Sequence, residues 1–322
     1  GAIAFGVAVE VRTTVDSAAN TIATGQAKYF AEGGINAAIA ALLASRSVRP
    51  GEVIADDPGK FRDGKRWLAY RYGAGTAVVE VVPENAKLPV NYLNKQQVAD
   101  LLAMVDPRTT GDADALVDWR SARLSSVDSE FDARYAQAQP PYRSNHAAMQ
   151  DLEEIIFVKG FDKTMFYGRR FEPADSTAEL SPALLDVLNA ESLPTPVNVN
   201  YAPYQVLATL SGWTPQLARD VVAERQDDSL QGSPYQSLDD LVRRVPPAAS
   251  VVGVSSISLN SGDMFTLTAT GINSDSGISQ TTRCLVRLNP QYPAGYKVMG
   301  WWDDWPWSQP PASVLVAMKE MP

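Results

Sequence analysis

The hydrophobic pattern at the start of the chain predicts one long helix. Residues 2–46 contain no proline, and the apolar positions near their end recur at the spacing of a single helix face. These positions are Ile35, Ala38, Ile39, Leu42 and Leu43. A helix of this length would reach about 70 Å at 1.5 Å per residue. We therefore expect part of it to project beyond the globular body, with Gly33-Gly34 as a point where it bends or lets another segment approach.

Strand patterns lie on both sides of a helical middle. Aromatic and β-branched residues around a glycine turn predict a hairpin from 67–72 and 77–82. Further strands are predicted at 254–259, 264–269, 280–288 and 296–301. The proline-rich tail that follows is expected to be irregular. The predicted elements therefore follow the order helix, strands, helices, strands. This order results when one domain is inserted into a loop of another.

The helical middle contains two near-copies of one pattern. An Asn-rich phrase opens each copy, at 90–94 and at 197–201. Both copies then continue in the same order: a helix, a turn, a second helix, an acidic loop, a Pro-Tyr pair and a helix with acidic residues at its start. Among the predicted helices are 97–102, 112–119, 149–158 and 237–244. We interpret the two copies as a tandem duplication of a helix-hairpin-helix unit.

Composition and charge narrow the class of protein. The chain has 322 residues, a net charge of −9 and a sequence pI near 4.8, which argues against a general affinity for nucleic acid phosphates. Cys284 is the only cysteine, so the sequence excludes an intrachain disulfide. No stretch is apolar enough for a membrane span. The apolar start, GAIAFGVAVEVR, suggests the remaining part of a longer hydrophobic helix, with an ordinary buried element as the alternative.

Several segments, in their order, resemble one family. They are QAKYFAEGGINAAIAAL, VVEVVPENAKLPVNYLN, the Asp118-Trp119 helix end, PPYRSNHAAMQDLEEIIFVKGF, VNVNYAPYQVLATLSG, MFTLTATG, TTRCLVRL and YKVMGWW. Together they cover nearly the whole chain, which is similar to minor pseudopilin K of bacterial type II secretion systems, the GspK family.

The resemblance implies an α+β pseudopilin fold. A long N-terminal helix would pack on an antiparallel sheet, and a large all-α domain of duplicated helix-hairpin-helix-like units would be inserted between strands. The corresponding domains are 1–92, 93–248 and 249–322. The resemblance also implies a non-enzymatic protein at the tip of the periplasmic pseudopilus, in complex with minor pseudopilins I and J and sometimes H. A hydrophobic helix, largely absent from this chain, would anchor it in the inner membrane.

The second hairpin is the candidate nucleic-acid site. Such modules hold a phosphate with backbone N–H groups of a Gly-rich turn. Here Trp213 stands inside the turn and Pro215 supplies no N–H, while acidic residues balance Arg219 and Arg225. We expect a packing unit and no nucleic-acid partner. A hairpin-based nucleic-acid-binding module of an exported protein is kept as the alternative function.

An acidic segment after the Asp-Trp helix end is a candidate calcium site. Members of the resembled family can hold Ca²⁺ there, and this hard cation takes six to eight oxygen ligands. Asp118 and Glu130 match the family pattern, and Asp128 and Asp132 could add charge. Ser121 and Arg123 stand where the family has further acids. A solvated acidic loop is the competing interpretation, and we predict no other cofactor.

Other chemistry-bearing residues have structural explanations. His146 is the only histidine and is expected at the surface or in a cap, and no common catalytic motif occurs. The turn at 273–277 resembles a short cation loop but is expected to be a β-turn. The C-terminal region has four tryptophans, Trp301, Trp302, Trp305 and Trp307. Either they contact a partner or a membrane surface, or Trp301 completes the sheet core and the other three fold back over it.

The predicted function is assembly, and the first helix supplies the predicted partner interface. Its lower part, around Ile35 to Leu42, would pack on the protein's own sheet. Its upper stretch, marked by Val7, Val11, Val15 and Ile22, would lie beside the helices of partner pseudopilins. A secreted carbohydrate-active enzyme is the weakest alternative.

Overall fold

The computed structural model describes most of the chain. It covers residues 2–47, 57–105, 113–122, 128–168, 183–190, 194–226, 229–230, 232–254, 256–306 and 310–320, with side chains from residue 17 onward. The contacts divide the chain into two compact units. We call Gly1–Val82, Gln226–Ser233 and Asp263–Pro322 the sheet unit, and Pro83–Arg225 with Pro234–Gly262 the helical unit. The predicted insert, 93–248, lies largely within the helical unit, and its limits stay a prediction.

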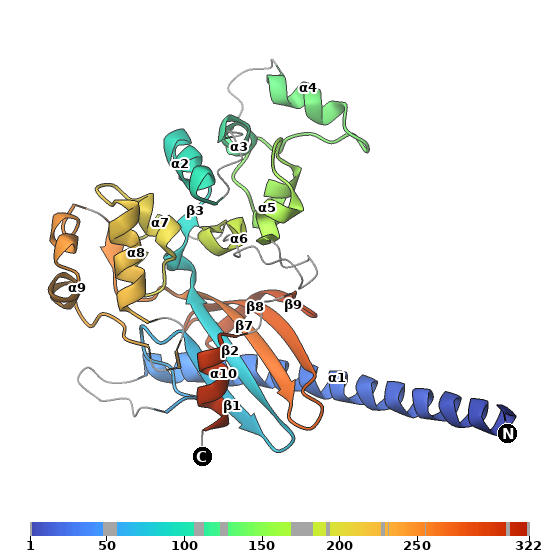
Figure 1. The fold of residues 1–322 in the computed structure, drawn as a ribbon. Helices are drawn as coiled ribbons and strands as arrows, with labels where there is room; N and C mark the ends of the chain where they lie inside the picture. The colour runs from blue at the N-terminus through green and yellow to red at the C-terminus, as the bar shows by residue number, and fades with distance from the viewer. Residues whose placement is uncertain are drawn as a thin grey trace. The chain divides into compact units, whose positions relative to one another are not determined.

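The sheet unit consists of a long helix, a five-stranded sheet and a short C-terminal helix (Figure 1). Its helices are α1 (Ala2–Arg46) and α10 (Ala312–Lys319). Its strands are β1 (Trp67–Tyr72), β2 (Gly75–Pro83), β7 (Met264–Asn273), β8 (Ser279–Leu288) and β9 (Tyr296–Trp302). The strand order is β1-β2-β7-β8-β9, so the helical unit is inserted in sequence between two neighbouring strands. The predicted hairpin and the strands at 264–269, 280–288 and 296–301 are confirmed.

Alternation along each strand gives the sheet two apolar faces. One face packs against α1 and includes Leu68, Val79, Leu267 and Val286, which are fully buried. The predicted helix positions Ile35, Ala38, Ile39 and Leu42 are buried in the same core. On the other face, Trp67, Ala69 and Val78 pack against Val314 and Met318 of α10. Burial of each large apolar side chain contributes about 1.5–3 kcal/mol, so both faces stabilise the unit.

Small residues bring α1 very close to the sheet. A Cβ added to Gly271 of β7 would lie 2.0 Å from the carbonyl oxygen of Ala27 and 2.4 Å from the amide nitrogen of Ala31. A Cβ on Gly34 would lie 2.7 Å from the Cβ of Ala77. The helix continues through Gly34, so this glycine allows close approach and does not bend the helix.

The helical unit is built from short helices and two short parallel strand pairs. Its helices are α2 (Lys95–Val105), α3 (Ala113–Arg120), α4 (Glu130–Ala136), η2 (Leu152–Phe157), α5 (Lys163–Tyr167), α6 (Leu184–Val187), α7 (Tyr204–Ala208), α8 (Pro215–Glu224), α9 (Leu238–Arg244), η1 (Glu84–Ala86) and η4 (Pro246–Ser250). Its strands are β3 (Leu88–Pro89), β4 (Leu188–Asn189), β5 (Val197–Asn198) and β6 (Ile257–Ser258). Strand β3 pairs with β4, and β5 pairs with β6.

The internal repeat is visible in the hydrogen bonds. Asn91 follows β3, donates to the carbonyl of Met149 at 3.0 Å and accepts from its N–H at 2.8 Å. Asn200 follows β5 and makes the same two bonds to Tyr235, at 3.0 and 2.8 Å. An acidic residue five positions later, Glu154 or Asp240, accepts from the next backbone N–H in each copy. The two copies therefore share one local architecture.

Two expectations about elements are wrong. The helix predicted at 149–158 is the shorter 3₁₀-helix η2, because Asp151 caps its start and Glu154 folds back in a capping box. The strand predicted at 254–259 is only β6, which pairs with β5 in the helical unit instead of joining the large sheet. The proline-rich tail at 303–311 has no helix or strand where the structure describes it, as expected. Helix α10, which follows this tail and buries the second face of the sheet, was not predicted.

Candidate partner interface

Helix α1 has a buried face and an exposed face. From Ala27 to Leu42 its small and aliphatic residues lie on the sheet, as described above. Residues 17–22 are all exposed, so at this level the helix has left the sheet behind. Figure 1 shows the N-terminal part of α1 running on beyond the strands. This free stretch is available for another helix, because apolar helix faces pack side by side through interlocking side chains.

The predicted interface positions fall on one side of α1. Val7, Val11, Val15 and Ile22 are spaced by four, four and seven residues, which keeps them on one helix face. The side chains of the first three lie outside the described residues. Ile22 is 63% exposed. Their role as a partner interface stays a prediction.

Tyr29 extends this face and was missed by the sequence reasoning. It follows Ile22 by seven residues and is 71% exposed. The sequence signal for Tyr29 is the seven-residue spacing, since Val15, Ile22 and Tyr29 follow one another at this interval. We call Ile22 and Tyr29 the apolar stripe of α1. Exposed large apolar side chains at helical spacing are typical of a surface that another protein covers.

Among the residues that the structure describes, no helix is both long enough and apolar enough to span a bilayer.

The predicted calcium ligands lie around the start of α4. Ser129 caps this helix and joins two of the acids, because its hydroxyl donates to Asp118 at 3.0 Å and its N–H donates to Asp132 at 2.9 Å. Asp128 and Glu130 are exposed. Arg123, which stands where the family has an acid, lies outside the described residues.

Asp118 and Asp132 are held by protein donors in this arrangement. Within the described ranges, no three His, Cys, Asp or Glu side chains are grouped so that they could hold a metal ion. The four acids therefore do not form a common oxygen cage as placed, and the calcium site stays a prediction. Calorimetric titration with Ca²⁺ after chelation tests this prediction. The absence of both binding heat and a thermal shift would contradict it.

His146 bridges the same segment. Its Nε2 lies 3.0 Å from the Asp132 carboxylate and its Nδ1 lies 3.2 Å from the Asp118 carbonyl oxygen. Both partners are oxygen atoms that accept hydrogen bonds. The group acts as a structural tie between α3, α4 and the following loop.

The second hairpin is a packing unit. Trp213 in its turn is buried, and Gly212 has a φ of 82°, which lets the chain turn sharply. Thr214 caps α8 by accepting from the N–H of Leu217 at 3.1 Å. Arg225, one of the two arginines that flank this turn in the sequence, is buried and donates to the carbonyl of Val199.

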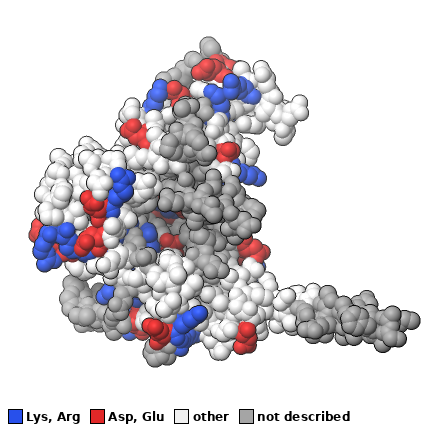
Figure 2. Space-filling view, viewed as in Figure 1, with Lys and Arg blue, Asp and Glu red and all other residues white. Residues whose placement is uncertain are grey.

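The surface charge of the hairpin region also differs from a phosphate-binding face. Figure 2 shows acidic and basic side chains interspersed over the α8–α9 region. Arg244 pairs with Glu224 at 3.2 Å, and Arg243 pairs with Asp240. Nucleic-acid affinity depends on cations that neutralise phosphates. Cations already paired with carboxylates on the protein are poorly suited to that task.

The tryptophans near the C-terminus have different roles. Trp302 and Trp305 hold the guanidinium of Arg283, whose carbon lies 5.6 and 4.7 Å from their ring centroids. Trp305 is buried. Trp301 is 38% exposed and donates from Nε1 to Asp303 at 2.8 Å. Trp302 and Trp305 therefore complete the sheet unit, while Trp301 is partly available at the surface; Trp307 lies outside the described residues.

Comparisons with known proteins add one finding. No family model matches the chain, and no curated protein matches it. A solved structure does: the crystal structure of the GspK-GspI-GspJ complex from the enterotoxigenic Escherichia coli type 2 secretion system contains a similar chain. The TM-score is 0.52 at 16% identity, over 91% of this chain and 99% of that one.

At this identity the likeness establishes the fold alone. The predicted α+β class is confirmed: a long N-terminal helix packs on a five-stranded antiparallel sheet, with a mostly helical region between strands in sequence. The chain has a pseudopilin-like fold.

Proposed function

We propose that this protein is a minor pseudopilin of a type II secretion system and corresponds to component K. The supporting observation is the extent of the structural similarity, which takes in 91% of this chain and 99% of a chain in the GspK-GspI-GspJ complex. The helical unit and the sheet unit are both included at that coverage. A chance likeness of a common sheet motif would leave the helical unit unmatched.

The proposed activity is assembly with other minor pseudopilins, I and J and in some systems H. The apolar stripe of α1 and the predicted positions Val7, Val11 and Val15 would pack against helices of these partners. The helical unit occupies Pro83–Arg225 and Pro234–Gly262, just over half of the chain. Such a bulky insert suits a subunit that ends a filament more than one that is repeated along it.

The proposed place of action follows from the same assignment. The protein would stand on the periplasmic side of the inner membrane, at the tip of the pseudopilus. A hydrophobic N-terminal helix would anchor it, and α1 would continue that helix. The tip complex would then initiate or cap the filament during protein export.

Co-expression tests the proposal. The chain is produced together with pseudopilins I and J of the same secretion system, with an affinity tag on this chain only. We expect the three to co-purify and to elute as one complex in size-exclusion chromatography. The matched control replaces I and J by the major pseudopilin of that system. Elution of the three proteins as separate species would contradict the proposal.

A further inference from the structure

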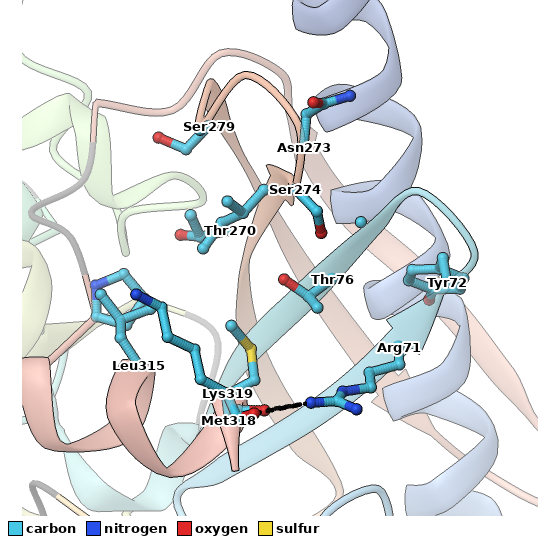
Figure 3. Close-up of a pocket in the computed structure, with 14 residues that line it drawn as sticks. Arg71, Tyr72, Thr76, Thr270, Asn273, Ser274, Ser279, Leu315, Met318 and Lys319 are labelled. Atoms are coloured by element: carbon cyan, nitrogen blue, oxygen red, sulfur yellow. Dashed lines mark hydrogen bonds between the residues drawn. The ribbon is translucent and has the colours of Figure 1, made fainter. Parts of the chain in front are cut away.

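The sheet unit contains a pocket at the turn end of its two β-hairpins. It has a volume of about 660 Å³ and lies where the β1–β2 hairpin, the β7–β8 turn and α10 meet. Figure 3 shows Arg71 reaching it from β1 and Lys319 from α10, with Thr76 and Thr270 on the strands between them. Pockets of this size accommodate small organic ligands in other proteins.

The two cations at this pocket are not neutralised by carboxylates. Arg71 uses Nη2 to donate to the carbonyl oxygens of Met318 and Lys319, at 3.2 and 3.1 Å. Its Nε and Nη1 groups and the Nζ of Lys319 form no hydrogen bond or ion pair with another described residue. None of the described residues that line the pocket is acidic. In a chain of net charge −9, this is a local region of positive charge.

Hydroxyl groups add further hydrogen-bonding capacity. The side chains of Thr76, Ser274 and Ser279 line the pocket and have no hydrogen-bond partner among the described residues. Thr270, which is buried, shares a hydrogen bond of 3.0 Å with Thr281. The polar lining therefore offers several N–H and O–H donors but no carboxylate acceptor.

Apolar side chains complete the lining. Ile272, Leu315 and Met318 contribute aliphatic surface from β7 and from α10. A ligand that fits the whole pocket therefore combines an acidic group with an apolar body. The Nε–H and Nη1–H groups of Arg71 and the ammonium of Lys319 can each donate a charge-assisted hydrogen bond to a carboxylate oxygen.

We propose that this pocket binds an organic carboxylate through Arg71 and Lys319. The carboxylate belongs either to a free organic acid or to an acidic residue in an extended peptide, since the same donors recognise both. The inference does not depend on the proposed assembly function, and failure of the co-purification experiment would leave it intact.

A pair of isosteric probes tests the charge requirement. The isotope-labelled full chain is titrated with N-acetylglutamate and, separately, with N-acetylglutamine amide, in which both carboxylates are replaced by amides. Amide shifts are followed by nuclear magnetic resonance. We expect the glutamate derivative to shift the amides of Ser274, Gly277 and Lys319 with millimolar affinity, and the glutamine derivative to leave them unchanged. No shift with either probe, or equal shifts with both, would overturn the proposal.

Substitutions test which residues of the pocket bind the carboxylate. Lys319→Met keeps the aliphatic stem and removes the charge, so we expect affinity for N-acetylglutamate to fall about threefold or more. Arg71→Gln should lower it further but also removes the contacts to the end of α10, so Lys319→Met is the decisive variant. Lys297→Met, on exposed β9 outside the pocket, is the matched control and should bind normally. Unchanged affinity in Lys319→Met would refute the role assigned to the pocket.

A comparison with a peptide ligand distinguishes the two sources of the carboxylate. The capped peptide Ala-Glu-Ala is compared with N-acetylglutamate on the same protein. Tighter binding of the peptide, again lost in Lys319→Met, supports an acidic peptide segment as the ligand. Equal or weaker binding of the peptide supports a free organic acid.

Discussion

At the scale of single residues, Gly271 decides how closely α1 approaches the sheet. Its missing side chain leaves room for the backbone of Ala27 and Ala31, and no flexible group stands there to move aside. Backbone cannot yield as the end of a long side chain can. Close packing of this kind is sensitive to one added methyl group.

We predict that Gly271→Ala lowers the free energy of unfolding by at least about 2 kcal/mol, because overpacking against rigid backbone forces α1 to shift. Urea denaturation measures the change. Gly25→Ala is the matched control on α1, where an added Cβ meets nothing within 4 Å. It should stabilise the protein by about 0.5–1 kcal/mol. A Gly271→Ala protein as stable as wild type would show that the helix does not lie as close as described.

The Asn200 side chain is the second residue with a large predicted effect. It is buried and makes both hydrogen bonds to Tyr235 described above. We predict that Asn200→Ala costs about 2–4 kcal/mol, because two buried hydrogen bonds are lost together. Asn36→Ala, exposed on α1, should change stability by less than about 0.5 kcal/mol. Equal unfolding midpoints for the two variants would be inconsistent with this role.

At the scale of elements, α1 combines two functions in one continuous helix. The face that includes Ala27, Ala31 and Leu42 is buried and holds the sheet unit together. The apolar stripe, Ile22 and Tyr29, contributes little to the protein's own core because both side chains are largely exposed. Substitutions on the two faces should therefore separate folding from assembly.

We predict that Ile22→Arg with Tyr29→Arg abolishes co-purification with pseudopilins I and J while the unfolding midpoint stays close to that of wild type. Burying two arginines in a helix–helix contact costs far more than leaving them in water. Asn20→Arg, exposed but off the stripe, is the control and should retain partner binding. Retention of the complex by the double variant would exclude the stripe from the interface.

Helix α10 is the other element with a consequence for function. Val314 and Met318 bury the second face of the sheet, and the same helix supplies Lys319 to the carboxylate pocket. The hydrogen bonds of Arg71 to backbone carbonyl oxygens of Met318 and Lys319 tie the last turn of α10 to β1. The pocket therefore depends on the docking of α10.

At the scale of the whole molecule, both units bury groups that ionise at high pH. Burial raises the pKa of the Cys284 thiol in the sheet unit from 9.0 to about 12. In the helical unit, burial raises the pKa of the Tyr135 hydroxyl from 10.0 to about 12. Burial also raises the pKa of Tyr70 in the sheet unit. All three groups keep their protons longer in the folded chain than in the unfolded one.

The stability of the folded chain is therefore expected to fall at high pH. Between about pH 9 and pH 12 the unfolded chain has released protons that the folded chain retains, so stability is complete below this range and falls as pH rises through it. We predict that the thermal midpoint decreases steadily above about pH 9. Cys284→Ala should reduce the slope near the start of the range, whatever its effect at pH 7. A midpoint independent of pH up to about pH 11 would contradict the prediction.

The sequence by itself determined the fold class and the order of the main elements. Uninterrupted helical spacing predicts α1, and strand alternation predicts the β1–β2 hairpin and the cores of β7, β8 and β9, because these signals are local. The repeated Asn-rich phrase predicts the internal repeat for the same reason. The acids of the predicted calcium site were also found in sequence, but hydrogen bonds from Ser129 and His146 engage two of them, and such pairing is not visible in a linear pattern.

Only the tertiary structure decided which segments meet. A one-dimensional pattern carries no distance between residues far apart in the chain. It could therefore not show that Gly271 lies against Ala27, that β6 pairs with β5, or that Arg71 and Lys319 share a pocket. Helix α10 was missed for a related reason: its proline-rich surroundings favour irregular structure, and burial against Trp67 and Val78 overrides that local preference.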